Sequence, residues 1–99
     1  MNTDFDVAQN IMIIEKLKAQ LINQVADLYQ NMLGCMPSDE ARAEILADIV
    51  ITVYLLSSKL GENIDSLDEK IVNKLRLGLL DESNKLHTEM SALIKRLSR

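Results

Sequence analysis

The 99-residue sequence predicts an all-α protein. Three glycines, one proline and three aromatic residues are too few for the turns and aromatic-rich strands of a β-sandwich or barrel. Apolar residues also recur every three or four positions over long stretches, which is the period of one helical face. The hydrophobic fraction of 47% is typical of a globular chain, and we expect one domain over residues 1–99.

The first helix is predicted from about residue 3 to residue 33, because no Gly or Pro occurs before Gly34. Its apolar stripe consists of Val7, Ile11, Ile14, Leu17, Leu21, Val25, Leu28 and Met32. A helix of this length would extend about 45 Å. We therefore expect a bend or break near its middle.

Three further helices follow from their capping residues. Ser38 is a typical N-cap, so the second helix is predicted from Asp39 to Leu60, before Gly61. The third is predicted to begin near Ser66 with a Ser66–Glu69 capping box and to end near Leu77, and the fourth to begin near Asp81. Four helices with short connections predict a four-helix bundle.

The second helix is apolar on nearly every side between Ile45 and Leu56. The other helices of so short a chain cannot cover it, so we expect a homodimer or a dimer of dimers that associates through this helix. The 12-residue stretch is too short to span a membrane. The N-terminus lacks the basic start of a secretory signal, which predicts a cytoplasmic protein without membrane contact. The net charge of −4 argues against nucleic acid as a partner.

Polar residues cross the two longest predicted helices. Glu44, Asp48 and Thr52 follow one another at four-residue steps on the second helix. The first helix carries Asn23, Gln24 and Asp27. A carboxylate among apolar neighbours, as Asp48 is, needs a partner. Two interpretations stay open: an ion pair with Lys16 or Lys18, or a metal ion.

The segment Glu44-Ile-Leu-Ala-Asp48, its apolar continuation to Leu-Gly61, and the later Glu69-Lys70 with Asn73 resemble the MazG-type all-α nucleoside triphosphate pyrophosphohydrolases. The similarity covers roughly residues 14–76. The C-terminal run looks like a divergent subgroup of small bacterial proteins. The resemblance implies a MazG-like bundle and hydrolysis of a nucleoside triphosphate to a monophosphate and pyrophosphate.

The resemblance also implies a Mg²⁺ site made of two carboxylate pairs on facing helices. At the matching positions this chain has Gln24 with Asp27 and Ile45 with Asp48, so two of four carboxylates are missing. Asp27 and Asp48 are the expected remaining metal ligands and Glu44 an auxiliary one, with Asn23 and Gln24 lining the site. Catalytic residues cannot be named, and whether the chain is an enzyme stays open.

The third predicted helix matches the segment in which the family contacts phosphate. The resemblance therefore implies phosphate contacts from Lys70, Lys74 and Arg76, against the simpler interpretation of a solvated helix face. Two functions follow. The first is a related pyrophosphohydrolase with low, altered or lost activity, and the alternative is a non-catalytic, dimeric helical module for binding or regulation.

Overall fold

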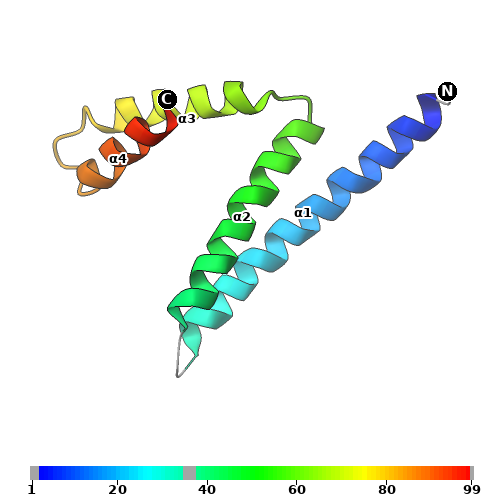
Figure 1. Ribbon diagram of the computed structural model, residues 1–99, viewed down its shortest axis with the longest axis horizontal. Helices are drawn as coiled ribbons and strands as arrows, with labels where there is room; N and C mark the ends of the chain where they lie inside the picture. The colour runs from blue at the N-terminus through cyan, green and yellow to red at the C-terminus, as the bar shows by residue number, and fades with distance from the viewer. Residues whose placement is uncertain (1–2, 35–37, 99) are drawn as a thin grey trace. The chain divides into compact units, whose positions relative to one another are not determined.

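The computed structural model describes residues 3–34 and 38–98. In these ranges it contains no strand and four helices, α1 (Thr3–Leu33), α2 (Asp39–Lys59), α3 (Ile64–Gly78) and α4 (His87–Leu97), which confirms the all-α prediction. The chain divides into two compact units, Met1–Gly61 with α1 and α2 and Glu62–Arg99 with α3 and α4 (Figure 1). Each unit is a helical hairpin. Within the described ranges, no helix has the length and apolar character needed to cross a membrane.

The sequence predicted the beginning of α2 correctly and the beginning of α3 wrongly. Ser38 is the N-cap of α2, and its Oγ accepts a hydrogen bond from the backbone N of Ala41 at 3.1 Å. The predicted Ser66 start of α3 is wrong. Asn63 caps this helix instead, because its Oδ1 accepts from the backbone N of Asp65 at 2.7 Å.

The predicted start of α4 near Asp81 is also wrong, because residues 79–86 form a turn. Asp81 Oδ1 accepts hydrogen bonds from the backbone N of Ser83 at 3.0 Å and from its Oγ at 2.7 Å. Asn84 Oδ1 accepts from the backbone N of Leu86 at 2.8 Å. Such side-chain contacts give the backbone an alternative to helix, so α4 begins only at His87.

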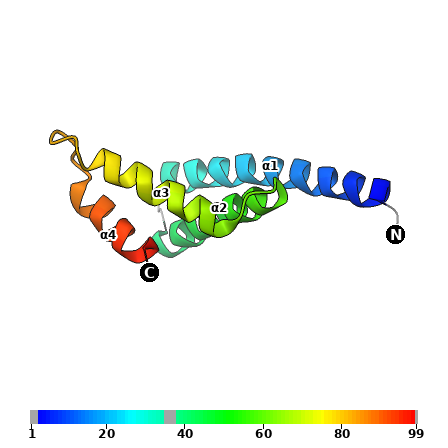
Figure 2. The same cartoon turned by 90° about the horizontal axis from the view of Figure 1, so that it is seen from above.

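The α1–α2 hairpin keeps one antiparallel register. Asn10 Nδ2 donates to the backbone O of Lys59 at 3.3 Å, and Asn31 Nδ2 donates to the backbone O of Ser38 at 3.5 Å. Both pairs of residue numbers add up to 69 (10 + 59 and 31 + 38). A residue n of α1 therefore lies beside residue 69 − n of α2, and the two helices lie side by side in both views (Figures 1 and 2).

The contact between α1 and α2 is formed by one row of residues on each helix, all half-buried except the buried Thr52, and we call these the inner rows. Their three- and four-residue steps alternate, as in a coiled coil. On α1 the inner row is Asn10, Ile14, Leu17, Leu21, Gln24, Leu28 and Asn31. On α2 it is Arg42, Ile45, Ile49, Thr52 and Leu56.

The helix α1 is continuous from Thr3 to Leu33, so the expected break does not occur. Half of the stripe predicted for it does not face α2. Val7, Ile11, Val25 and Met32 keep 49–63% of their surface exposed. The sequence pattern merged two neighbouring rows into one, because both rows are apolar.

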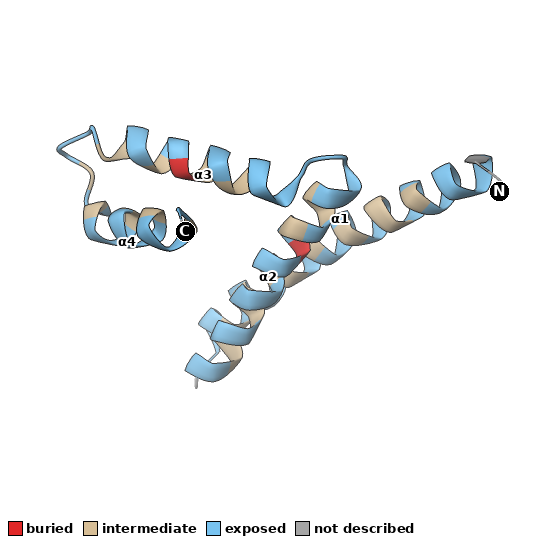
Figure 3. Cartoon of the chain, turned by 45° about the horizontal axis from the view of Figure 1, so that its top comes forward, coloured by how far each residue is buried: buried red, intermediate tan, exposed pale blue. Residues whose placement is uncertain are grey.

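Little of this chain is buried. Among the described residues, only Thr52 in the first unit, which is 2% exposed, and Val72 in the second, which is 6% exposed, are buried (Figure 3). Large apolar residues are exposed on several sides of α2, among them Leu46, Val50 and Leu55. Within the first unit, α1 therefore covers one side of α2 and leaves the rest of its apolar surface exposed.

The α3–α4 hairpin surrounds Val72 with half-buried apolar residues. These are Leu67, Ile71, Leu75, Met90, Ile94 and Leu97. Gly78 brings the two helices close together, because a Cβ at this position would lie 3.1 Å from the Sδ atom of Met90. This hairpin holds Lys70, Lys74 and Arg76.

Candidate functional site

The candidate metal ligands lie on one side of the α1–α2 hairpin. Each of them comes one position before an inner-row residue: Asp27 before Leu28, Asp48 before Ile49, and Glu44 before Ile45. The two helices run in opposite directions. The residue that precedes an inner-row residue therefore lies on the same side of the pair in both helices. We call this side the carboxylate face.

The two aspartates on this face lie at different levels of the hairpin. In the observed register Asp27 lies beside Arg42 and Asp48 beside Leu21. These levels are six residues apart, which is about 9 Å along a helix axis. Between them lies the layer formed by Gln24 and Ile45, whose numbers add up to 69.

Asp48 is exposed, so the expectation of a desolvated carboxylate is wrong. Nor does the predicted alternative, an ion pair with Lys16 or Lys18, occur in the described ranges, where the ion pairs involve neither Asp27 nor Asp48. Lys18 binds Glu15 at 2.8 Å instead. The apolar sequence around Asp48 misled the prediction because the apolar residues beside it are themselves largely exposed.

Gln24 lies in the inner row beside this face and is the candidate site residue that is most constrained by packing. Its Oε1 atom is buried and has no hydrogen-bond partner within the described residues, and the same is true of Asn31 Oδ1. A buried acceptor without a donor typically costs about 1–3 kcal/mol. Residue 24 therefore has spare capacity for a donor or a cation.

The residues of this face do not make up the Mg²⁺ site that the resemblance implies. Mg²⁺ needs several oxygen ligands about 2.1 Å away in octahedral geometry. The described part of the chain contains no cluster of three or more His, Cys, Asp or Glu side chains suited to a metal. One amide oxygen between two aspartates that are about 9 Å apart along the hairpin is a poor substitute.

The candidate phosphate contacts divide into two groups on α3. Lys70 and Lys74 are four residues apart, so they share one face of the helix, and both are exposed. Arg76 is also exposed but lies about 200° away from Lys74 around the helix axis. The three side chains therefore do not converge within α3.

An open hollow that sequence reasoning missed lies between the start of α3 and the end of α4. Its lining consists of Asp65, Asp68, Glu69, Val72, Leu97 and Ser98. The signal for it was the run of acids at the start of α3, opposite the last turn of α4. None of the predicted site residues belongs to it.

Comparison with known proteins relates the whole helical region to one family. The model of the MazG-like family matches residues 7–93. The chain belongs to the MazG-like family. This match spans both helical hairpins and confirms the resemblance found in the sequence. No curated protein matches the chain. No solved structure matches it either.

Membership in the MazG-like family relates this chain to nucleoside triphosphate pyrophosphohydrolases, a generally metal-dependent class. The family assignment itself names neither a substrate nor an activity for the chain. Whether the chain shares the activity of that class depends on its residues at the metal-binding positions, which are Gln24, Asp27, Ile45 and Asp48.

Proposed function

We propose that this MazG-like protein keeps the helical scaffold of the nucleoside triphosphate pyrophosphohydrolases with hydrolysis weakened or lost. The observation that supports this proposal is the layer of Gln24 and Ile45 in the α1–α2 hairpin. The resemblance implies carboxylates at these two positions. An uncharged amide and an aliphatic side chain in their place remove two negative charges from the inner rows beside the carboxylate face.

The loss of these charges weakens cation binding for an electrostatic reason. Mg²⁺ gives up its water reluctantly and is held in proteins by carboxylates together with substrate phosphates. Asp27 and Asp48 supply charge at levels on either side of this layer, and Glu44 is the one further carboxylate that the face offers between them. A triphosphate is itself negatively charged and needs the cation to offset its repulsion by the carboxylates, and two carboxylates hold that cation less firmly than four.

The direct experiment is an incubation of purified protein with a panel of ribo- and deoxyribonucleoside triphosphates and Mg²⁺. We expect pyrophosphate release to be absent or far below the typical enzyme rate of about 1–10³ per second. The Asp48→Asn variant is the control for contaminating enzymes, since their activity would survive the substitution. Turnover within that typical range that Asp48→Asn abolishes would contradict the proposal.

A gain-of-function experiment tests the physical reason. The double variant Gln24→Glu with Ile45→Glu restores a carboxylate at both positions of the central layer. We expect it to bind Mg²⁺ measurably tighter than the parent chain in a calorimetric titration. The matched control Ala26→Glu with Ala47→Glu adds the same charge at two exposed positions that lie neither in this layer nor on the carboxylate face, and it should bind no better than the parent.

A second candidate function is a non-catalytic helical module that binds a partner. The observation that favours it is the exposed apolar surface of the α1–α2 hairpin, which a monomeric protein of this size would not keep in water. Nucleotide binding without hydrolysis is compatible with this role, with Lys70 and Lys74 as the phosphate contacts. Calorimetric titration of the parent chain with ATP, with and without Mg²⁺, tests it, and a Lys70→Glu variant should abolish any binding found.

A further inference from the structure

We infer that Met90 is a redox-sensitive modification site, at which a peroxide converts the thioether to a sulfoxide and thereby opens the α3–α4 hairpin. Methionine sulfoxide formation is reversible in proteins, because dedicated reductases return the sulfoxide to the thioether. The inference concerns the second unit alone. It does not depend on whether the chain hydrolyses nucleotides.

The sulfur of Met90 lies against the backbone at the end of α3. Met90 belongs to the first turn of α4, and its side chain is half-buried. A Cβ at Gly78 would lie 3.1 Å from Sδ and 3.4 Å from Cε of Met90. The neighbour of the sulfur is therefore a piece of helix backbone, which cannot move aside as a flexible side chain can.

The side chain of Asn84 connects this sulfur to both ends of the turn. Its Nδ2 donates hydrogen bonds to the backbone O of Gly78 at 3.1 Å and to Sδ of Met90 at 3.3 Å. Its Oδ1 accepts a hydrogen bond from the backbone N of Leu86 at 2.8 Å. One amide thus joins the last residue of α3, the residue before α4 and the thioether.

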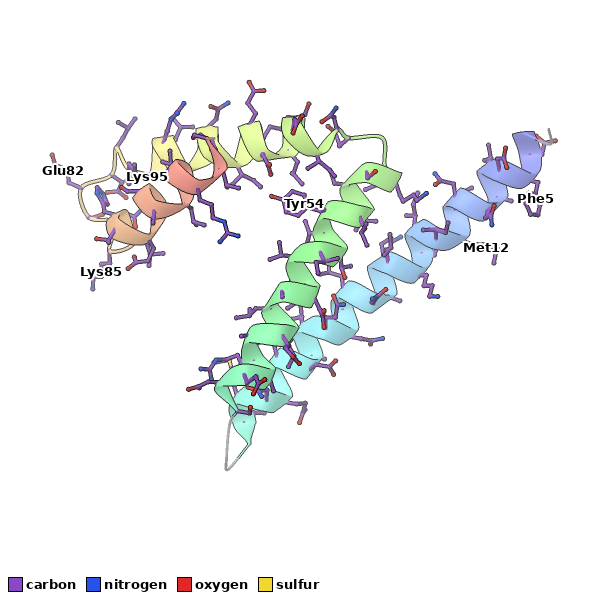
Figure 4. The ribbon with its side chains drawn as sticks, in the orientation of Figure 1. Phe5, Met12, Tyr54, Glu82, Lys85 and Lys95 are labelled. Carbon is purple, nitrogen blue, oxygen red and sulfur yellow. The ribbon has the colours of Figure 1, made fainter. Side chains whose placement is uncertain are left out.

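Asn84 is the residue through which the turn reaches the interior of the hairpin. Glu82 and Lys85 project outward from the turn (Figure 4), and Asn84 between them is half-buried. The other residues of the segment 80–86 are exposed. A change at Met90 therefore acts on the one inward contact of this segment.

The modification is a transfer of one oxygen atom from a peroxide to Sδ. A lone pair of the sulfur attacks one peroxide oxygen, and the O–O bond breaks. The attacked oxygen gives its proton to the leaving oxygen, which departs as water from hydrogen peroxide or as an alcohol from an alkyl peroxide. The sulfur is oxidised and the peroxide is reduced, so no further reactant is needed.

The added oxygen has no suitable place in the closed hairpin. A thioether is a weak hydrogen-bond acceptor, whereas a sulfoxide is polar and needs a donor. An oxygen directed at Asn84 enters the 3.3 Å gap between Nδ2 and Sδ and pushes the amide away from Gly78 O. An oxygen directed elsewhere lies against the Gly78 backbone or among apolar side chains, where it is buried without a donor.

The second unit has little packing with which to absorb this cost. Val72 is its one residue in the described range that is less than 9% exposed. Elements with few buried apolar contacts open readily, and a local loss then increases the open population directly. We expect the equilibrium constant for opening of the hairpin to rise about tenfold or more when Met90 is oxidised.

Two other methionines provide an internal comparison. Met12 and Met32 keep 71% and 63% of their surface exposed, and Met12 projects from α1 away from α2 (Figure 4). Exposed methionines react readily with oxidants, and an oxygen added to them stays in water. Their oxidation should therefore precede that of Met90 and leave the helices unchanged.

Hydrogen exchange after peroxide treatment tests the inference on the full chain, in a Cys35→Ser background that excludes thiol chemistry. Mass spectrometry of peptides measures the oxidation of each methionine. The backbone amides of Leu86 and Met90 are hydrogen-bonded in the closed hairpin. Their exchange should become about tenfold faster or more once Met90 is oxidised, and exchange in α1 and α2 should not change. Treatment with methionine sulfoxide reductases should restore slow exchange.

Three variants assign the effect to one sulfur atom. Met90→Leu keeps an apolar side chain of similar size, so its exchange should be slow and insensitive to peroxide. The matched control Met12→Leu with Met32→Leu keeps Met90 and should respond to peroxide as the parent does. Met90→Gln places a polar oxygen near the position of the sulfoxide, and it should show fast exchange without any oxidant.

Several results would overturn the inference. One is an equal response to peroxide in Met90→Leu and in the parent chain. Others are unchanged exchange at full oxidation of Met90, and slow exchange in Met90→Gln. Resistance of Met90 to peroxide under conditions that oxidise Met12 and Met32 completely would overturn it as well.

Discussion

Replacing Gln24 by leucine should stabilise the α1–α2 hairpin. The Oε1 atom of Gln24 is buried without a hydrogen-bond partner in the described residues, in a layer whose other member is Ile45. Removing an unsatisfied acceptor recovers about 1–3 kcal/mol, and a leucine of similar length keeps the layer filled. We therefore expect about 2 kcal/mol of added stability, which corresponds to a rise in Tm of about 8–16 °C for a unit of this size.

Thermal unfolding followed by circular dichroism at the helical band measures this shift. The control is Gln30→Leu, which makes the same chemical change at an exposed position of α1 and should alter stability by less than about 0.5 kcal/mol. A fall in Tm for Gln24→Leu together with an unchanged Gln30→Leu would refute the reasoning. It would mean that Oε1 accepts a bond from a donor or a cation in solution.

Three further predictions concern the ends of the helices. The hydrogen bonds from the Ser83 side chain and backbone lower the pKa of Asp81. The stability that ionised Asp81 gives the α3–α4 turn should therefore be present above about pH 4 and be lost as the pH falls below it. Hydrogen exchange at the backbone amide of Ser83 would detect this loss. Gly78→Val should destabilise the second hairpin by about 1–3 kcal/mol in urea titrations because it crowds Met90, and Met90→Ala should recover part of the loss. Ser38→Ala should cost about 1 kcal/mol through loss of the N-cap of α2, measured by thermal unfolding.

The number and order of the helices could be predicted from the sequence because their signals are local. The three- and four-residue period, Ser38 and the glycines after α1 and α2 depend on near neighbours along the chain. The start of α4 could not be found in this way. Asp81 is a common N-cap residue, but its side chain binds Ser83 within a turn, and only the folded turn distinguishes the two uses.

For the candidate site, the sequence proposes residues but does not give their geometry. A resemblance to a family can identify Asp27 and Asp48 as corresponding positions. It cannot give their offset, which depends on the register set by Asn10 with Lys59 and by Asn31 with Ser38. The exposure of Asp48 was equally hidden, because the sequence does not reveal that the apolar residues around it lack cover.

The inner row of α1 and the exposed apolar positions that follow it by one residue, such as Ile11, Val25 and Met32, restrict how the gene can change. A one-residue insertion near the middle of the helix would rotate everything beyond it by about 100°, so that beyond the insertion other residues would replace the inner row against α2. Seven inserted residues would return both rows nearly to their places. Natural length variation in α1 should therefore occur in whole heptads, and single-residue insertions should be selected against even where every inserted residue favours helix.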